Sequence, residues 1–354
     1  LPAGAGELEQ VIVIGRKPAT ADGDHLHGFT SYLNADDQLA SPVNLASIVD
    51  RQPGVAFSGQ GGLFQTVAIR GLSRQRVGNF FLDVPLLSER RAGTAASFID
   101  PAMVGEIELV RGPATTAYGS GNIGGLVRSL PATPGGVRAE LSWGGSGREN
   151  GIMLAAGDEA AYAAVSRRAS DRAESAAGDP LNTEFEQYNL MAGGSLDVAD
   201  ARYELVTLAS YGRDIGKSNN RYPDDRITYY PRERHWLTQL TRRGDSSTGS
   251  VYFHHQDLET SVLRPEQRLD TVRASALDFG ARYARAWREG SPWHWGAEYM
   301  GRRDVESEEW TTPVGGSRGP AQQTLQASQD EFAVFLEGRY RWRDVTATGG
   351  LRFT

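Results

Sequence analysis

Residues 331–342 read EFAVFLEGRYRW, and the alternation of side chains in this stretch decides the fold class. One set of alternate positions is apolar, and it includes Phe332, Val334, Leu336, Tyr340 and Trp342. The positions between them carry two glutamates and two arginines. Successive side chains of a β-strand point to opposite faces of the sheet. The stretch therefore predicts a strand with one apolar face and one charged face.

The same alternation extends in both directions from this strand. Residues 345–353 (VTATGGLRF) and 292–301 (PWHWGAEYMG) repeat it, and from residue 137 onward similar runs are joined by connections that alternate between short and long. Transmembrane barrels have short turns at one end, long loops at the other, strands of about ten residues and aromatic girdles. The aromatic residues at strand ends are Trp143, Tyr188, Tyr211, Trp236, Trp287, Trp293, Tyr340 and Trp342.

We therefore predict a mainly β protein with an antiparallel transmembrane β-barrel in residues 137–354. A soluble β-sandwich is the alternative, but it explains neither the alternating connections nor the aromatic residues at strand ends. About eleven strands can be counted, and the last ends within GGLRFT. Because bacterial barrels of one chain have an even number of strands and no free edge, we expect a fragment with about 11 of 22 strands.

Composition excludes several classes of function. The net charge of −7 argues against a nucleic-acid partner or an anionic membrane surface, since both require clustered Lys and Arg. The absence of cysteine excludes thiol catalysis, disulfides and thiolate metal sites. Mean hydropathy is −0.43, and no run of about eighteen apolar residues predicts a transmembrane helix. The N-terminal residues LPAGAGELEQ also lack the features of a signal peptide.

The segment 118–125, YGSGNIGG, matches the G-x-G-x-x-G pattern of dinucleotide-binding turns. That turn must follow a buried strand directly and must open a helix. Here RGPATTA separates the apolar run EIELV from Gly119, and Pro131 and Pro134 would end a following helix within about two turns. The pattern therefore gives little support to a nucleotide enzyme, and the glycines indicate tight backbone turns.

Four blocks before residue 126 together resemble the plug domain of TonB-dependent outer-membrane receptors. They are LASIVDRQPGV (45–55), VAIRGL (67–72), FFLDVPLL (80–87) and IDPAMVGEIELVRGPATTAYGSGNIGG (99–125). The resemblance implies a small α+β plug domain in residues 18–136, inside the barrel of residues 137–354, after a periplasmic segment in residues 1–17. One departure is Val84 after Asp83, where the family usually has glycine, so we expect a turn without positive φ.

The resemblance also implies residues for coupling and for holding the plug. Glu9, Gln10, Val11, Ile12, Val13 and Ile14 are our candidate for the TonB box, a β-prone segment that adds an edge strand to its partner. The same residues could be the first strand of the plug. Arg70 and Arg111 match the plug arginines that barrel glutamates hold in the family, although both could be ordinary solvated arginines.

Ligand-binding candidates combine arginines with aromatic residues, which suit a planar anionic chelate; solvated loop charge is the alternative. They are Arg74, Arg76, Arg90 and Arg91 in the plug, and Tyr222, Tyr229 and Tyr230 in a predicted loop of residues 217–234. His25 and His27 would share a face if extended, as a metal or haem ligand pair, or they are loop histidines. His254 and His255 should point to opposite faces of a strand.

These observations favour an energy-coupled importer of the bacterial outer membrane. The implied partners are TonB with its inner-membrane energising complex, outer-membrane lipid and a small ligand, first a ferric siderophore and otherwise haem or cobalamin. A passive porin or an adhesin barrel is the alternative of another class. The sequence contains neither the G-x-S-x-G nor the H-E-x-x-H pattern, so we predict no enzyme; we also predict no cofactor and no nucleic-acid partner.

Overall fold

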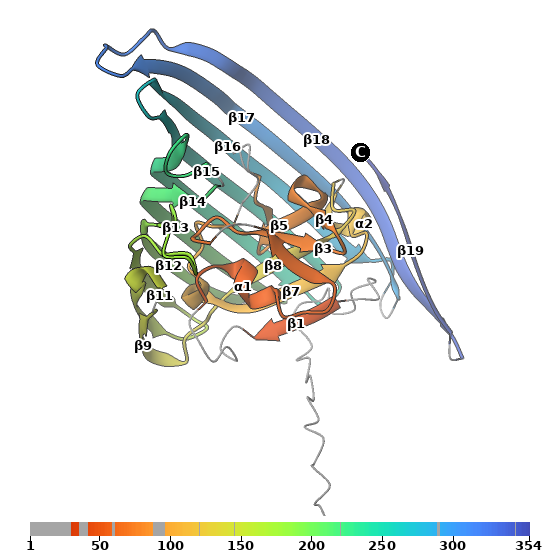
Figure 1. Cartoon of the computed structure of the whole chain (residues 1–354). Helices are drawn as coiled ribbons and strands as arrows, with labels where there is room; N and C mark the ends of the chain where they lie inside the picture. The colour runs from red at the N-terminus through yellow and green to blue at the C-terminus, as the bar shows by residue number, and fades with distance from the viewer. Residues whose placement is uncertain are drawn as a thin grey trace, which may run out of the picture.

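The computed structural model describes residues 30–34, 42–58, 61–87, 96–119, 121–144, 146–219, 221–288, 291–343 and 345–354. These residues form a small mixed domain that lies against the concave side of one large curved antiparallel sheet (Figure 1). We call the first part the plug and the sheet the wall. Among the described residues, no helix is long and apolar enough to cross a membrane.

The plug contains two small sheets and several short helices. Its larger sheet has the order β1-β7-β8-β5-β6, in which β5 and β8 are parallel and the other pairs are antiparallel. The smaller sheet has the order β2-β3-β4. The elements are β1 (Thr30–Asn34), α1 (Leu45–Val49), β2 (Val55–Ser58), β3 (Thr66–Ile69), β4 (Leu72–Ser73), η2 (Arg74–Arg76), β5 (Val77–Phe81), β6 (Val84–Pro85), η3 (Pro101–Met103), β7 (Val104–Arg111), α2 (Thr115–Tyr118) and β8 (Gly125–Pro131).

The plug has an apolar core between α1 and the larger sheet, and this core continues into buried side chains of the wall such as Met191 and Leu208. Val49, Phe81, Ile107 and Leu109 are fully buried in it. Helix α1 begins where the Asn44 side chain accepts a hydrogen bond from the Ser47 amide, which satisfies one of the free N–H groups of the first turn. The core is thus built from the apolar blocks that the sequence resemblance identified.

The wall is an eleven-stranded sheet in which each strand pairs with its neighbours in the chain, from β9 at one edge to β19 at the other. Its strands are β9 (Gly136–Trp143), β10 (Asn150–Gly157), β11 (Tyr162–Ser170), β12 (Phe185–Val198), β13 (Ala201–Lys217), β14 (Ile227–Gly244), β15 (Ser247–Arg264), β16 (Arg268–Ala286), β17 (Trp293–Pro313), β18 (Gln322–Trp342) and β19 (Val345–Phe353). The predicted incomplete barrel is confirmed: β9 and β19 do not pair with each other, and the sheet is open.

The two faces of the wall differ as the alternation predicted. On β18, Phe332 is 62% exposed on the outward face, whereas Ala333 and Phe335 are 1% and 4% exposed on the face toward the plug. All eight aromatic residues predicted for the girdles are large exposed side chains. His254 is buried and His255 is exposed, so these two histidines point to opposite faces, as predicted.

The strands are longer than the roughly ten residues expected from membrane thickness, and β17 and β18 have 21 residues each. Much of the predicted loop 217–234 belongs to β13 and β14. Pro231 lies inside β14, where the register with β15 shifts between Tyr229 and Arg232. A bulge tolerates proline, which cannot donate to the regular ladder.

The turn between β5 and β6 also differs from its prediction. Leu82 has φ of 55°, so the turn does use a left-handed residue, one position before Asp83. Hydrogen bonds hold this conformation: the Leu82 amide donates to the Ser129 carbonyl at 2.9 Å, and Arg128 Nε donates to the Leu82 carbonyl at 2.7 Å. These two hydrogen bonds therefore stabilise the positive φ of Leu82, a conformation that glycine adopts without strain.

Candidate functional site

Side chains from the wall hold two segments of the plug, residues 83–87 and 97–100. Gln187 on β12 donates to the Ser97 carbonyl at 3.0 Å, and Ser210 on β13 donates to the Phe98 carbonyl at 2.9 Å. Gln256 on β15 donates to the Leu87 carbonyl at 3.0 Å. These inward side chains are buried, so neutral single hydrogen bonds supply much of the contact.

Two aspartates of the plug receive paired contacts from the wall. Gln239 on β14 accepts from the Asp83 amide at 3.0 Å and donates to Asp83 Oδ2 at 3.2 Å. Asp100 accepts from Ser166 Oγ at 2.5 Å and forms an ion pair with Arg168 at 3.4 Å, both on β11. With Arg282 on β16, which donates to the Ala117 carbonyl, six consecutive strands contact the plug.

An aromatic contact joins the same plug segment to the middle of the wall. The Phe98 ring is stacked on His235 of β14, with ring centroids 3.8 Å apart and planes at 9°. His235 bonds to Glu233 through Nε2 at 2.8 Å and to His254 through Nδ1 at 3.0 Å. The stack buries Phe98 almost completely. Sequence reasoning missed these inward polar residues, although their alternation with outward apolar residues was the available signal.

The interior of the plug contains a buried charged group of a different kind. Arg128 pairs with Asp83 at 2.7 Å and with Glu108 at 3.2 Å, and all three side chains lie within the plug. Burial alone would raise the pKa of Asp83, but the guanidinium groups of Arg128, Arg282 and Arg243 together outweigh it and hold the pKa below its usual 3.8. Asp83 therefore connects this charged interior to Gln239 of the wall.

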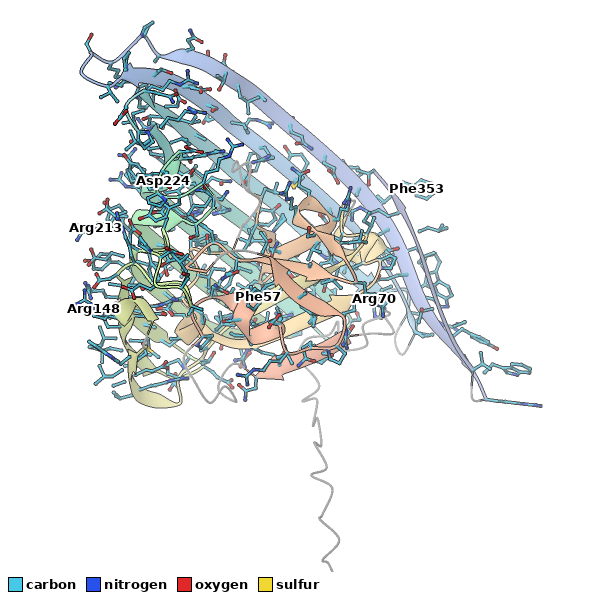
Figure 2. The ribbon with its side chains drawn as sticks, in the orientation of Figure 1. Phe57, Arg70, Arg148, Arg213, Asp224 and Phe353 are labelled. Carbon is cyan, nitrogen blue, oxygen red and sulfur yellow. The ribbon has the colours of Figure 1, made fainter. Side chains whose placement is uncertain are left out.

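The structure brings the two arginines of the predicted plug–barrel lock to one side of the plug. Arg111 donates to the Pro53 carbonyl at 3.1 Å and to Ser31 Oγ at 2.6 Å. Arg70 lies beside Gly54 and Gly112, around the same turn. Figure 2 places Arg70 on the part of the plug farthest from Asp224, which marks a long loop of the wall. Their role as a lock stays a prediction.

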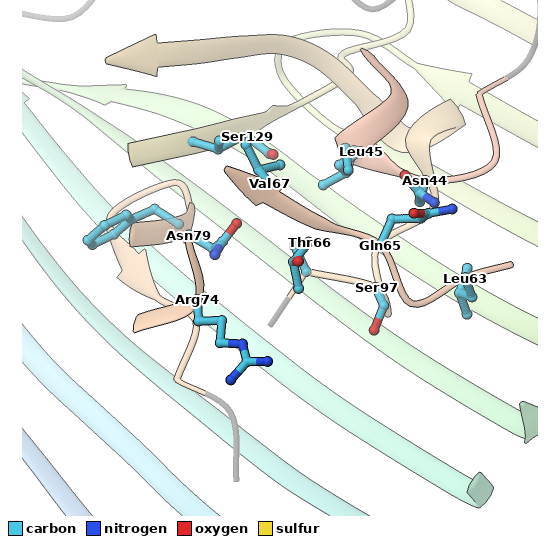
Figure 3. Close-up of a pocket in the computed structure, with 14 residues that line it drawn as sticks. Asn44, Leu45, Leu63, Gln65, Thr66, Val67, Arg74, Asn79, Ser97 and Ser129 are labelled. Carbon is cyan, nitrogen blue, oxygen red and sulfur yellow. The ribbon is translucent and has the colours of Figure 1, made fainter. Parts of the chain in front are cut away.

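The ligand-binding candidates of the plug are placed only in part. Arg74 and Arg76 form η2, with Arg74 at φ of 60°, and Arg76 is exposed. Arg74 also lines a cavity of about 30 Å³ together with Asn44, Gln65 and Ser97 (Figure 3). A cavity of this size holds a water molecule or two and no chelate. Arg90, Arg91, His25, His27 and the TonB-box residues 9–14 lie outside the described residues.

The three tyrosines predicted to bind ligand do not come together. Tyr222 lies between β13 and β14, with the Arg172 guanidinium 5.9 Å from its ring centroid. Tyr230 is 3% exposed and packs on Phe64 of the plug at 4.5 Å between ring centroids. Tyr229 is the adjacent residue on β14 and therefore points to the opposite face. Tyr230 thus serves as a packing residue at the long-loop end.

Comparison with known proteins identifies the plug. Residues 29–126 match the family model described as TonB-dependent Receptor Plug Domain. The chain carries a TonB-dependent receptor plug domain. The strands after it have the fold of part of the barrel wall in solved structures of transporters and receptors. The apolar outward face of the wall is its lipid-facing side.

Individual relatives share parts of their length with this chain. A hemin receptor of Yersinia enterocolitica is 37% identical over 120 residues, which are 30% of this chain and 17% of that receptor. A ferrioxamine B receptor of Salmonella typhimurium is 28% identical over 185 residues, which are 51% of this chain and 26% of the receptor. The chain therefore spans well under half of these curated relatives in the matched regions.

Solved structures have the same fold. The copper transporter OprC superposes with a TM-score of 0.74 at 18% identity, covering 91% of this chain and 54% of OprC. FpvA of P. aeruginosa bound to a pyoverdine and iron gives a TM-score of 0.68 at 12% identity, covering 93% of this chain and 51% of FpvA. At sequence identities this low, the similarity shows a shared fold and does not identify the cargo.

Proposed function

We propose that the protein imports a scarce nutrient across the outer membrane, with ligand bound at the long-loop end and TonB pulling the N-terminal segment. The single observation that carries this proposal is the plug–wall contact, in which six consecutive strands hold the plug. Three of these six bonds join neutral side chains to backbone carbonyls. Each contributes about 0.5–1.5 kcal/mol, so water can replace them one at a time when the plug is pulled.

We favour a ferric siderophore as the cargo. Arg74 and Arg76 offer cationic groups on the plug, and the Arg172–Tyr222 pair offers an arginine with an aromatic ring at the long-loop end. Arginine and tyrosine bind anionic, partly planar chelates through charge-assisted hydrogen bonds and stacking. The relatives include receptors named for hemin and for ferrioxamine, so haem is the second candidate and cobalamin the third.

A growth panel distinguishes these cargoes. A strain deleted for the gene, and the same strain carrying it, would be grown on single iron sources: hydroxamate, catecholate and mixed siderophores, and haemin. Gene-dependent growth on one ferric siderophore supports the proposal. Growth on haemin alone identifies a haem importer. A passive porin would instead let small sugars through in liposome swelling and would show no dependence on TonB.

We also propose residues 1–17 as the coupling segment, 18–136 as the plug and 137–354 as part of the barrel, with Glu9–Ile14 as the TonB box. Val11→Pro removes a backbone N–H and fixes φ, which prevents strand addition to TonB. We expect uptake to stop while the dissociation constant of the ligand at the cell surface stays unchanged. Pro18→Ala, outside the segment, is the control, and wild-type uptake by Val11→Pro would reject the assignment.

A further inference from the structure

The outward face of strands β11 to β14 changes from apolar to basic toward the long-loop end. Val165, Leu190 and Trp236 are 48%, 48% and 55% exposed on the apolar part. The next outward residues toward the long loops are Tyr188 and Tyr211, whose rings stack with centroids 6.4 Å apart. Arg167, Arg213 and Arg234 surround these tyrosines, and we call these three arginines the outer arginine patch. Figure 2 shows Arg213 on the outside of the wall, away from the plug.

The strand register places the patch in two adjacent rows across the sheet. Arg167 pairs with Tyr188, Tyr188 with Tyr211, and Tyr211 with Arg234, which makes one continuous row. Arg213 lies in the next row, opposite Glu186. Side chains in such rows are close enough to act on one ligand group. Three of these four neighbouring strands, β11, β13 and β14, therefore present an arginine at this level of the wall.

One carboxylate serves two of the three arginines. Glu186 Oε1 accepts from Arg167 Nε at 3.0 Å and Nη2 at 2.7 Å, and from the Tyr188 hydroxyl at 2.6 Å. Glu186 Oε2 pairs with Arg213. Both guanidinium groups remain about half exposed, with side-chain exposures of 43% and 48%. Their remaining N–H donors thus face the surroundings of the wall.

Arg234 contributes a second unbalanced charge. Its guanidinium carbon lies 5.6 Å from the centroid of the Tyr211 ring. Its cross-strand neighbour Asp257 is bonded to Arg232 at 3.3 Å and to Arg273 at 3.0 Å. Within the part of the chain that the structure describes, no carboxylate pairs with Arg234. Glu186 balances one of the three arginines of the patch, so the patch keeps two positive charges, although the whole chain has a net charge of −7.

We propose that the outer arginine patch binds the phosphate groups of a phosphorylated glycolipid in the outer leaflet. The patch lies at the long-loop end of the strands, directly beyond the aromatic girdle, where lipid headgroups meet the protein. Guanidinium groups bind phosphate oxygens in a bidentate manner, and the apolar rows of Val165, Leu190 and Trp236 provide a surface for the acyl chains. The proposal rests on the outer-membrane location and is independent of the cargo.

The test measures binding of bis-phosphorylated lipid A to the purified protein in a nonionic detergent. The combined variant Arg167→Gln, Arg213→Gln and Arg234→Gln should weaken binding about tenfold or more, since each guanidinium supplies charge-assisted bonds. The matched control is Arg242→Gln with Arg285→Gln, two outward arginines at the short-turn end of β14 and β16. The control should bind as the wild type does.

A variant of opposite sign separates recognition from a folding defect. Glu186→Gln removes the internal competitor for Arg167 and Arg213, so it should tighten lipid A binding severalfold. Dephosphorylated lipid A should bind weakly to every variant, and millimolar inorganic phosphate should not displace lipid A. Unchanged affinity in the triple variant, weaker binding in Glu186→Gln, an equal loss in the control, or displacement by inorganic phosphate would each overturn the proposal.

Discussion

The interior of the plug and its contact with the wall are held together by different chemistry. The interior combines fully buried apolar residues such as Phe81 and Ile107 with a charged group around Arg128. The contact with the wall combines glutamine and serine hydrogen bonds to plug carbonyls with apolar packing. Phe98 stacks on His235, and Phe64 packs on Tyr230. The plug therefore resists opening, whereas its attachment to the wall can be broken stepwise.

The largest effect is expected at Arg128 in the plug interior. Arg128→Met leaves Glu108 and Asp83 buried without their shared cation, which should cost about 3–5 kcal/mol. Hydrogen exchange of β7 and β8 amides measures this loss as a lower free energy of opening. Arg138→Met, which breaks an exposed pair with Glu140, should cost less than about 1 kcal/mol. Equal costs for the two variants would contradict the distinction between interior and surface charge.

Lowering the pH should weaken the ion pair between Asp83 and Arg128 and so destabilise the plug. Because the pKa of Asp83 is below its usual 3.8, the ion pair with Arg128 contributes its full stability above about pH 4. This contribution should disappear as pH falls below 3.8 through the pKa of the folded protein. Opening of the plug measured between pH 5 and pH 2 should therefore become easier in the wild type. The Arg128→Met variant should lack this part of the pH dependence.

Phe98 tests the apolar packing of the contact. Phe98→Ala removes a buried ring stacked on His235 and should cost about 3–4 kcal/mol. We expect faster hydrogen exchange in residues 97–100 and little change in β7. Phe57→Ala removes a plug phenylalanine that is 43% exposed, and it should cost less than about 1 kcal/mol. Equal acceleration throughout the plug would show that contact and interior are one cooperative unit.

Gln239 should show the smallest of these effects. Gln239→Leu removes the acceptor for the Asp83 amide and the donor to Asp83 Oδ2, and it should cost about 1–3 kcal/mol. The loss should appear as faster exchange around the turn of residues 82–85. Thr238→Val on the outward face of the same strand controls for changes in β14 itself. Unchanged hydrogen exchange at residues 82–85 would show that Gln239 does not stabilise the contact between plug and wall.

The sequence predicted the wall well and the site poorly, for physical reasons. Alternation fixes which face each strand residue occupies, so the exposure of Phe332 and the burial of Ala333 followed directly. Long-range contacts leave no local pattern, and the pairing of Gln239 with Asp83, 156 residues apart, could not be read from spacing. Tyr230 was predicted to lie in a loop, but it belongs to β14, where a bulge accommodates Pro231.

The central claim is that the plug must separate from the wall for transport. Because the chain contains no cysteine, Asp100→Cys with Ser166→Cys can tether the plug to β11 where these two side chains are in contact. The pair would be joined by oxidation to a disulfide or by a short bis-methanethiosulfonate, which forms reducible disulfides with both thiols, and each single cysteine variant serves as its control. We predict that ligand binding persists in the tethered protein, that uptake falls to background, and that reduction of the disulfide restores it. Uptake at the rate of the single variants while the tether is intact would contradict the account.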